Sequence, residues 1–85
     1  MANYKVDITN SARKEIKNLD SQITKRIVEK LKSLEENPFP SGCKKLVAQN
    51  GYRIRVGDYR IIYDVIEAEK IVRVYKAVHR KDAYR

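Results

Sequence analysis

Several residue types that commonly stabilise or activate small proteins are scarce in this chain of 85 residues. It contains one cysteine, one histidine, three glycines, two prolines and no tryptophan. Cys43 cannot form an internal disulfide, and with a single distant His79 it cannot build a cysteine-rich zinc site. Stability must therefore come from packing alone.

Signals that direct a protein into or across a membrane are absent as well. No run of about 18 apolar residues occurs. The N-terminal stretch MANYKVDITN lacks the basic start and the apolar core of a signal peptide. We therefore expect a cytoplasmic protein that does not bind a membrane.

Sequence motifs of several enzyme classes are also missing. The chain has no Walker or dinucleotide-binding glycine motif, no paired histidines and no serine elbow, which disfavours nucleotide hydrolysis, redox chemistry and triad hydrolysis. The acidic residues of the second half are scattered and mostly at expected turns: Asp58, Asp64, Glu67, Glu69 and Asp82. We therefore expect no metal and no small-molecule cofactor.

The chain does contain enough apolar sequence for one small domain, together with a large excess of positive charge. With 42% hydrophobic and 35% charged residues it has the composition of a folded protein, and we expect residues 1–85 to form one domain with a two-layer core. The net charge of +8 is uneven. Residues 1–42 carry eight Lys and Arg against six Asp and Glu, whereas residues 43–85 carry eleven against five.

Arginines and tyrosines are concentrated in the same basic half. Six of the eight arginines lie there, accompanied by Tyr52, Tyr59, Tyr63 and Tyr84. Guanidinium groups on rigid strands can hold a phosphodiester backbone, and aromatic rings can stack on its bases. This pattern favours an RNA-directed protein. The simpler alternative is a basic, well solvated surface without a specific ligand.

The first residues predict a strand that leads into a helix. Tyr4, Val6 and Ile8 alternate with polar residues, as in a half-buried strand. Thr9 is a suitable N-cap, and the apolar residues after it recur at helical spacing. We therefore expect a helix over residues 10–19.

A second helix should follow at once and form a hairpin with the first. Asp20 or Ser21 can cap it, and it should end before Pro38. Its apolar stripe consists of Ile23, Ile27, Leu31 and Leu34. The charged residues on its outer face are expected to be a solvated surface: Lys25, Arg26, Glu29, Lys30 and Glu36.

The second half predicts three strands, over residues 52–56, 59–66 and 71–78. A two-residue turn at Gly57 and Asp58 joins the first two, and residues 67–70 join the last two. Residues 43–49 fit no element clearly and are left unassigned. The predicted order is β-α-α-β-β-β, an α+β fold with a helical hairpin packed on one face of a small, curved, mostly antiparallel sheet.

Arginines alternate with the apolar residues of the first of these three strands. Since the apolar positions must face the helices, Arg53 and Arg55 should share the other face, with side chains about 7 Å apart. That spacing suits successive phosphates of an RNA strand. Arg60 would lie on the same face if it follows the same alternation. Because Ile61 and Ile62 are both apolar, the sequence does not show which face Arg60 occupies.

Two segments resemble the RelE/ParE superfamily of toxin–antitoxin modules, and more closely the RelE-type ribosome-dependent mRNA endonucleases. They are GYRIRVGDYRIIYDV at residues 51–65 and VHRKDAY at residues 78–84, and the element order agrees along nearly the whole chain. The resemblance implies functional roles for the residues that match the family's basic and aromatic positions: Arg53, Arg55, Arg60, Arg80 and Tyr84.

By this resemblance, the substrate is mRNA in the ribosomal A site, cleaved by attack of a 2′-hydroxyl to leave a 2′,3′-cyclic phosphate and a 5′-hydroxyl. Arg60 and Arg80 would stabilise the phosphorane, and Tyr84 would stack on a base or help to move a proton. Arg53 and Arg55 would hold the RNA backbone. Lys44 and Lys45, just before the predicted strands, are expected to add to this RNA-binding surface.

The general base is the role for which this chain departs from the family. RelE-type enzymes have lysines at the positions of Arg53 and Arg55, and arginine stays protonated where lysine can act as a base. His79 and Tyr84 remain as candidates, His79 because its unperturbed pKa lies near neutrality.

The resemblance also implies a partner, a small, acidic, partly disordered RelB-like antitoxin that covers the basic face and through which the complex could bind operator DNA. The other expected partners are the ribosome and mRNA. Two alternatives stay open. One is a ParE-like inhibitor of DNA gyrase with the same fold, and the other is a non-catalytic RNA-binding relative.

Overall fold

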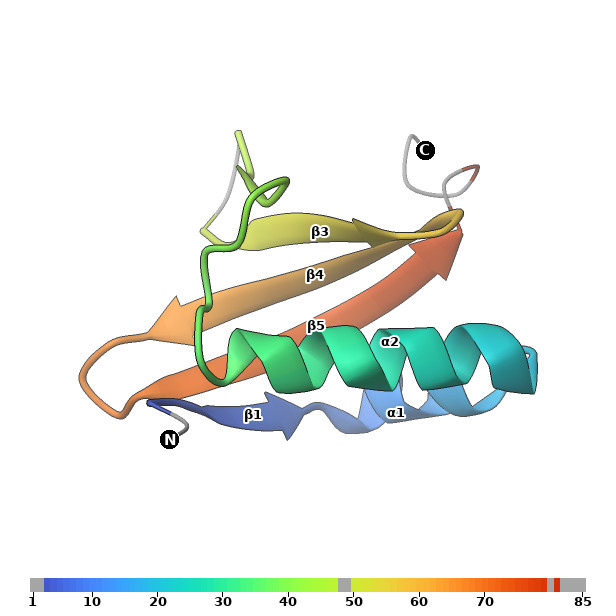
Figure 1. Cartoon of the computed structure of the whole chain (residues 1–85), viewed down its shortest axis with the longest axis horizontal. Helices are drawn as coiled ribbons and strands as arrows, with labels where there is room; N and C mark the ends of the chain where they lie inside the picture. The colour runs from blue at the N-terminus through green and yellow to red at the C-terminus, as the bar shows by residue number, and fades with distance from the viewer. Residues whose placement is uncertain (1–2, 48–49, 80, 82–85) are drawn as a thin grey trace.

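A computed structural model describes residues 3–47, 50–79 and 81 of the chain (Figure 1). Two helices lie on one face of a five-stranded sheet with the strand order β1-β5-β4-β3-β2. The elements are β1 (Lys5–Ile8), α1 (Asn10–Lys17), α2 (Ser21–Leu34), β2 (Lys44–Lys45), β3 (Tyr52–Val56), β4 (Tyr59–Ile66) and β5 (Ile71–His79). The predicted α+β architecture is confirmed. The segment that was left unassigned adds one short strand, β2.

The sheet is mixed. β2, β3, β4 and β5 pair antiparallel in sequence order, whereas β1 pairs parallel with β5. The two helices together form part of the long connection that a parallel pair needs. Alternation of side chains had predicted β1 as a strand but could not identify its neighbour, because a period of two reports which face a residue occupies and not which strand lies beside it.

The helix boundaries follow the predicted caps. The side chain of Thr9 accepts a hydrogen bond from the backbone N–H of Ala12 at 3.2 Å, so its N-cap role is confirmed. The predicted first helix was two residues too long, since α1 ends at Lys17. Asp20 occupies the N-cap position of α2, although its side chain makes no capping hydrogen bond.

The core lies between α2 and the inward-facing residues of the central strands. Ile27, Leu31 and Leu34 from α2 are buried, and Ile23 at the start of the same stripe is half-buried. The sheet contributes a matching buried layer: Ile54, Val56, Ile61, Tyr63, Val72, Val74 and Ala77. Alternating residues of β3 and β4 therefore point towards the helices, as predicted.

Tyr63 is the largest fully buried side chain and ties the sheet to the loop after α2. Its hydroxyl donates to the backbone carbonyl of Pro38 at 2.7 Å, and its ring lies 5.9 Å from that of Tyr52. Burial raises the pKa of the Tyr63 phenol well above its ordinary value. The side chain therefore acts as a neutral hydrogen-bond donor inside the core.

A register shift separates the two halves of β5. Ile62 pairs with Lys76 and Tyr63 with Val74, so that Tyr75 has no partner on β4. Just beyond it, the backbone N–H of Ala77 donates to a carboxylate oxygen of Glu15 at 3.2 Å. α1 thereby holds the end of β5, where β1 no longer pairs with it.

None of the helices within the described ranges is long and apolar enough to cross a membrane.

The variant Tyr63→Phe should lower the free energy of unfolding by about 1–2 kcal/mol, because the buried Pro38 carbonyl loses its partner. Urea or thermal unfolding measures this change. Tyr52→Phe is the matched control, because the Tyr52 hydroxyl makes no hydrogen bond among the described residues and its ring contacts would remain. Equal stability of the two variants would contradict the structural role of the Tyr63 hydroxyl.

Candidate nucleic-acid interface

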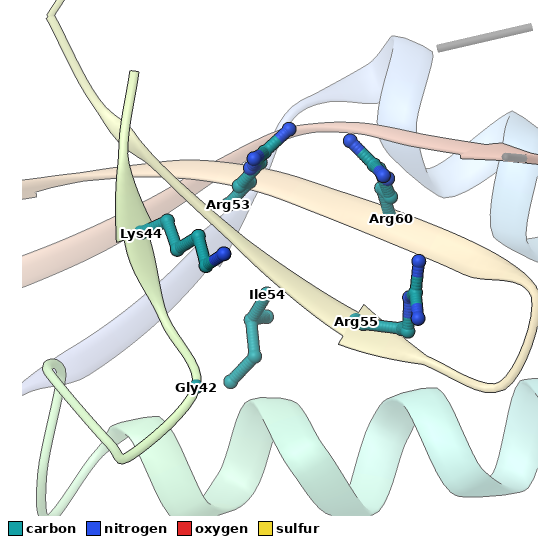
Figure 2. Close-up of a pocket in the computed structure, with 6 residues that line it drawn as sticks. All are labelled: Gly42, Lys44, Arg53, Ile54, Arg55 and Arg60. Carbon is teal, nitrogen blue, oxygen red and sulfur yellow. The ribbon is translucent and has the colours of Figure 1, made fainter. Parts of the chain in front are cut away.

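Four basic side chains lie on the face of the sheet opposite α1 and α2, here called the helix-free face. Arg55 on β3 is directly opposite Arg60 on β4, and Lys44 on β2 is opposite Arg53. Directly paired residues of neighbouring strands point to the same face. Figure 2 shows the arginines pointing away from α2, whereas Ile54 between them points towards it.

These side chains line a hollow of about 330 Å³, here called the arginine hollow. Its lining residues are Gly42, Lys44, Arg53, Ile54, Arg55 and Arg60. They come from the loop after α2 and from three neighbouring strands. The sheet therefore gathers cationic groups that are up to 16 positions apart in sequence around one concave surface.

Arg60 occupies the centre of the sheet, because β4 lies between β3 and β5. It is buried, with 9% of its surface exposed, while Arg55 beside it is exposed. The sequence left the face of Arg60 open. The register resolves that question, since Ile61 is fully buried on the helix side and Arg60 must take the other.

Three of the cations that line the arginine hollow have no acidic partner among the residues that the structure describes. Within the described part of the chain, Lys44, Arg53 and Arg55 have no carboxylate within 4.0 Å, and the two ion pairs formed there lie elsewhere. These pairs are Lys70 with Glu67, and Arg73 with Asp7. A concave surface that presents Lys44, Arg53 and Arg55 attracts anions and polyanions.

Two further predicted site residues, Lys45 and His79, are not brought to the arginine hollow. Lys45 is opposite Tyr52, so its side chain lies on the face of the sheet that the helices cover. His79 is opposite Tyr59, with the two rings edge to face at 5.3 Å, and it lies on the same face. Arg80 and Tyr84 lie outside the described residues.

No group of three or more His, Cys, Asp or Glu side chains suited to a metal ion occurs in residues 3–47, 50–79 and 81. The chemistry that the described hollow offers is that of guanidinium and ammonium groups, which donate hydrogen bonds to phosphate oxygens and stabilise negative charge.

Sequence reasoning missed a second hollow, of about 380 Å³, at the outer face of α2. It is lined by Arg26, Glu29, Lys30, Ser33, Arg55, Val56 and Gly57. We had assigned Arg26, Glu29 and Lys30 to a solvated surface. The available signal was that Arg26 and Lys30 are four residues apart and so share one face of a helix.

A family model described as the ParE toxin of the type II toxin–antitoxin system parDE matches residues 6–84. The chain is also 29% identical over 86 aligned residues to a curated protein of Methanocaldococcus jannaschii that is provisionally named toxin RelE1. That alignment covers 96% of each protein.

Solved structures of toxin–antitoxin complexes contain chains with a similar fold. The RelE–RelB complex of Pyrococcus horikoshii OT3 has a chain that is 28% identical, with a TM-score of 0.79 over 92% of this chain and 96% of that one. For the RelBE2 complex of Mycobacterium tuberculosis the values are 26% identity and a TM-score of 0.82, over 92% and 99% of the two chains.

Binding of an anion in the arginine hollow should stabilise the fold. Pyrophosphate at about ten times its dissociation constant should add about 1.4 kcal/mol, a rise of several degrees in melting temperature. The double variant Arg53→Ala/Arg55→Ala should lose at least half of this rise, as measured by thermal unfolding. Arg13→Ala, which removes an exposed arginine of α1, should keep it. An equal rise in all three proteins would show that the hollow is not the binding site.

Proposed function

The chain belongs to the RelE/ParE superfamily of type II toxins, and on this premise we propose that it cleaves mRNA in the ribosomal A site. Cleavage would proceed by attack of a 2′-hydroxyl on the adjacent phosphate, leaving a 2′,3′-cyclic phosphate and a 5′-hydroxyl. The protein would act in the cytoplasm, where ribosomes are found, and no metal ion is required for this route.

The observation that carries the proposal is the convergence of Arg53, Arg55 and Arg60 around one hollow on the helix-free face. Arginine forms two parallel hydrogen bonds to a phosphate and keeps its charge throughout the reaction. Three guanidinium groups on paired strands are held by the sheet, so they need little reorganisation when charge develops on the phosphate.

The positions of the arginines support different roles. Arg53 and Arg55 lie on one strand and would hold the backbone on either side of the scissile linkage. Arg60 is buried in the middle of the sheet, where solvent screens its charge less. It would stabilise the phosphorane. Arg80 and Tyr84 keep the roles implied by the resemblance, a second stabiliser of charge and a ring that stacks on a base or moves a proton.

Proton transfer needs a group that arginine cannot provide. In the reaction the 2′-oxygen bonds to phosphorus, the bond from phosphorus to the 5′-oxygen breaks, the 2′-hydroxyl loses a proton and the 5′-oxygen gains one. Lys44 is the one residue lining the described hollow that can exchange a proton. We assign removal of the 2′-hydroxyl proton to the Lys44 amine, because His79 lies on the helix side of the sheet. The hydroxyl of Tyr84 would donate the proton that the 5′-oxygen gains.

Neutralisation would be the task of a cognate RelB-like antitoxin, as in the solved complexes of related toxins. An acidic segment laid over the arginine hollow would be attracted by its charge and would exclude RNA from it. Binding of operator DNA would then be a property of the antitoxin within the complex.

A gyrase inhibitor is the second function that an observation favours, because the matching family model is described by the ParE toxin. Such a toxin does not need a set of arginines around one phosphate site. A supercoiling assay with purified gyrase distinguishes the two functions, and we expect no inhibition at concentrations that cleave ribosome-bound mRNA.

Replacement of the charge-stabilising arginines should lower cleavage of ribosome-bound mRNA about a hundredfold or more. We would test Arg60→Met, which keeps much of the side-chain volume, and Arg80→Ala, with Arg13→Ala as the control. Unfolding midpoints identify any variant that loses activity through misfolding. A loss of less than about threefold in Arg80→Ala, or in a folded Arg60→Met protein, rejects the assigned role.

Lys44→Arg should lower the single-turnover rate about a hundredfold while RNA binding stays intact, because the charge remains but the base is lost. Lys45→Arg is the matched control, since its side chain lies on the other face. A Lys44→Arg protein that cleaves at the wild-type rate would disprove the assignment.

A further inference from the structure

We propose that the hollow at the outer face of α2 is a second phosphate subsite, which extends the RNA path from the arginine hollow around the edge of the β3–β4 hairpin. We call it the α2 subsite and define it by Arg26, Lys30 and the shared Arg55. This inference rests on the proposed function, because it concerns the same RNA ligand.

Arg55 connects the two hollows. It stands near the end of β3 and lines both the arginine hollow and the hollow at α2. An RNA strand that leaves the scissile phosphate along β3 can therefore pass from one hollow to the other at Arg55, which borders both. One continuous backbone can contact both groups of cations.

Arg26 lies close to the turn that joins β3 to β4. Gly57 in this turn has a φ of +58°, and a Cβ atom there would lie 3.4 Å from a guanidinium nitrogen of Arg26 and 3.3 Å from Cδ1 of Ile23. The missing side chain lets the guanidinium group approach the hairpin closely. The Arg26 guanidinium therefore lies near the end of the strand that carries Arg55.

Lys30 lies one helical turn after Arg26 on the same face of α2. The hydroxyl of Ser33 donates to the carbonyl of Lys30 at 2.6 Å, so the donors left for a ligand are the two cationic side chains. Neither Arg26 nor Lys30 has a carboxylate within 4.0 Å among the residues that the structure describes. Both side chains can therefore turn to a phosphate.

Glu29 is the one acidic residue of the subsite. Against Arg26, Lys30 and Arg55 it leaves an excess of two positive charges, which attracts the phosphates of an RNA strand that already lies in the arginine hollow. The carboxylate should weaken binding by repelling the phosphate. Its removal is therefore expected to strengthen the interaction.

The subsite can be tested by the dependence of binding on the length of the RNA. The probe is single-stranded RNA with a 2′-deoxy group at the cleavage position, in a short form of about four nucleotides and a long form of about twelve. For Arg26→Ala/Lys30→Ala we expect a loss of about tenfold in affinity for the long strand and a change of less than twofold for the short one. The salt slope for the long strand should fall by about 1.4, since two phosphate contacts are lost.

Two further variants sharpen the result. Lys25→Ala/Lys32→Ala removes the same charge from the same helix but lies outside the hollow, and it should bind both strands as the wild type does. Glu29→Gln should bind the long strand severalfold more tightly. Unfolding midpoints of all variants confirm that the helix is intact.

The source of the phosphate is resolved by repeating the comparison on ribosomes. Loss on free RNA assigns the subsite to the substrate strand, and loss confined to ribosomes assigns it to ribosomal RNA. Unchanged binding in both assays, or an equal loss in the two double variants, overturns the inference. If the wild-type protein binds RNA but fails to cleave ribosome-bound mRNA, the proposed function fails while the subsite is still tested.

Discussion

The pairing of β3 with β4 is the constraint on which the core and the site both depend. Ile54 is opposite Ile61 and Arg55 is opposite Arg60, so one register sends apolar side chains towards α2 and guanidinium groups to the other face. A slip by one residue would exchange the two faces, burying charge and exposing the core. The turn at Gly57 and the layer of buried isoleucine and valine favour this register, so they position the arginine hollow as well as the core.

Gathering cations on a small sheet opposes folding, because like charges at close range repel one another. The packing on the other face must offset that repulsion. Tyr63 is fully buried and donates to the Pro38 carbonyl, which holds β4, the strand of Arg60, in place. Glu15 accepts from the backbone N–H of Ala77 and holds the neighbouring strand β5. An acidic ligand on the helix-free face would relieve the repulsion and stabilise the folded state.

The sequence patterns predicted the helices, strands and turns that depend on residues close together in the chain. They missed the features that depend on which strand or helix lies beside another. Alternation located β3, β4 and their turn, and Thr9 marked the start of α1. The parallel partner of β1 and the two-residue β2 could not be predicted, since neither leaves a periodic signal. The face of Arg60 required the register, because two isoleucines follow it. The sequence predicts a solvated helix face for Arg26 and Lys30, because it does not show that both border a hollow with the turn at Gly57.

Arg53 and Arg55 stand where the resemblance implies lysines. Lysine can both bind a phosphate and transfer a proton, whereas in this chain the two tasks would fall to different residues. Arginine can form two hydrogen bonds to a phosphate, but it cannot take the proton of the 2′-hydroxyl. Lys44, opposite Arg53 on the short edge strand, supplies a titratable amine to the same hollow from a different element. Because β2 has two residues, paired only with β3, its position depends on few hydrogen bonds. If the protein acts as proposed, binding of RNA along β3 would stabilise the pairing of β2 and so couple substrate binding to the proton transfer proposed for Lys44.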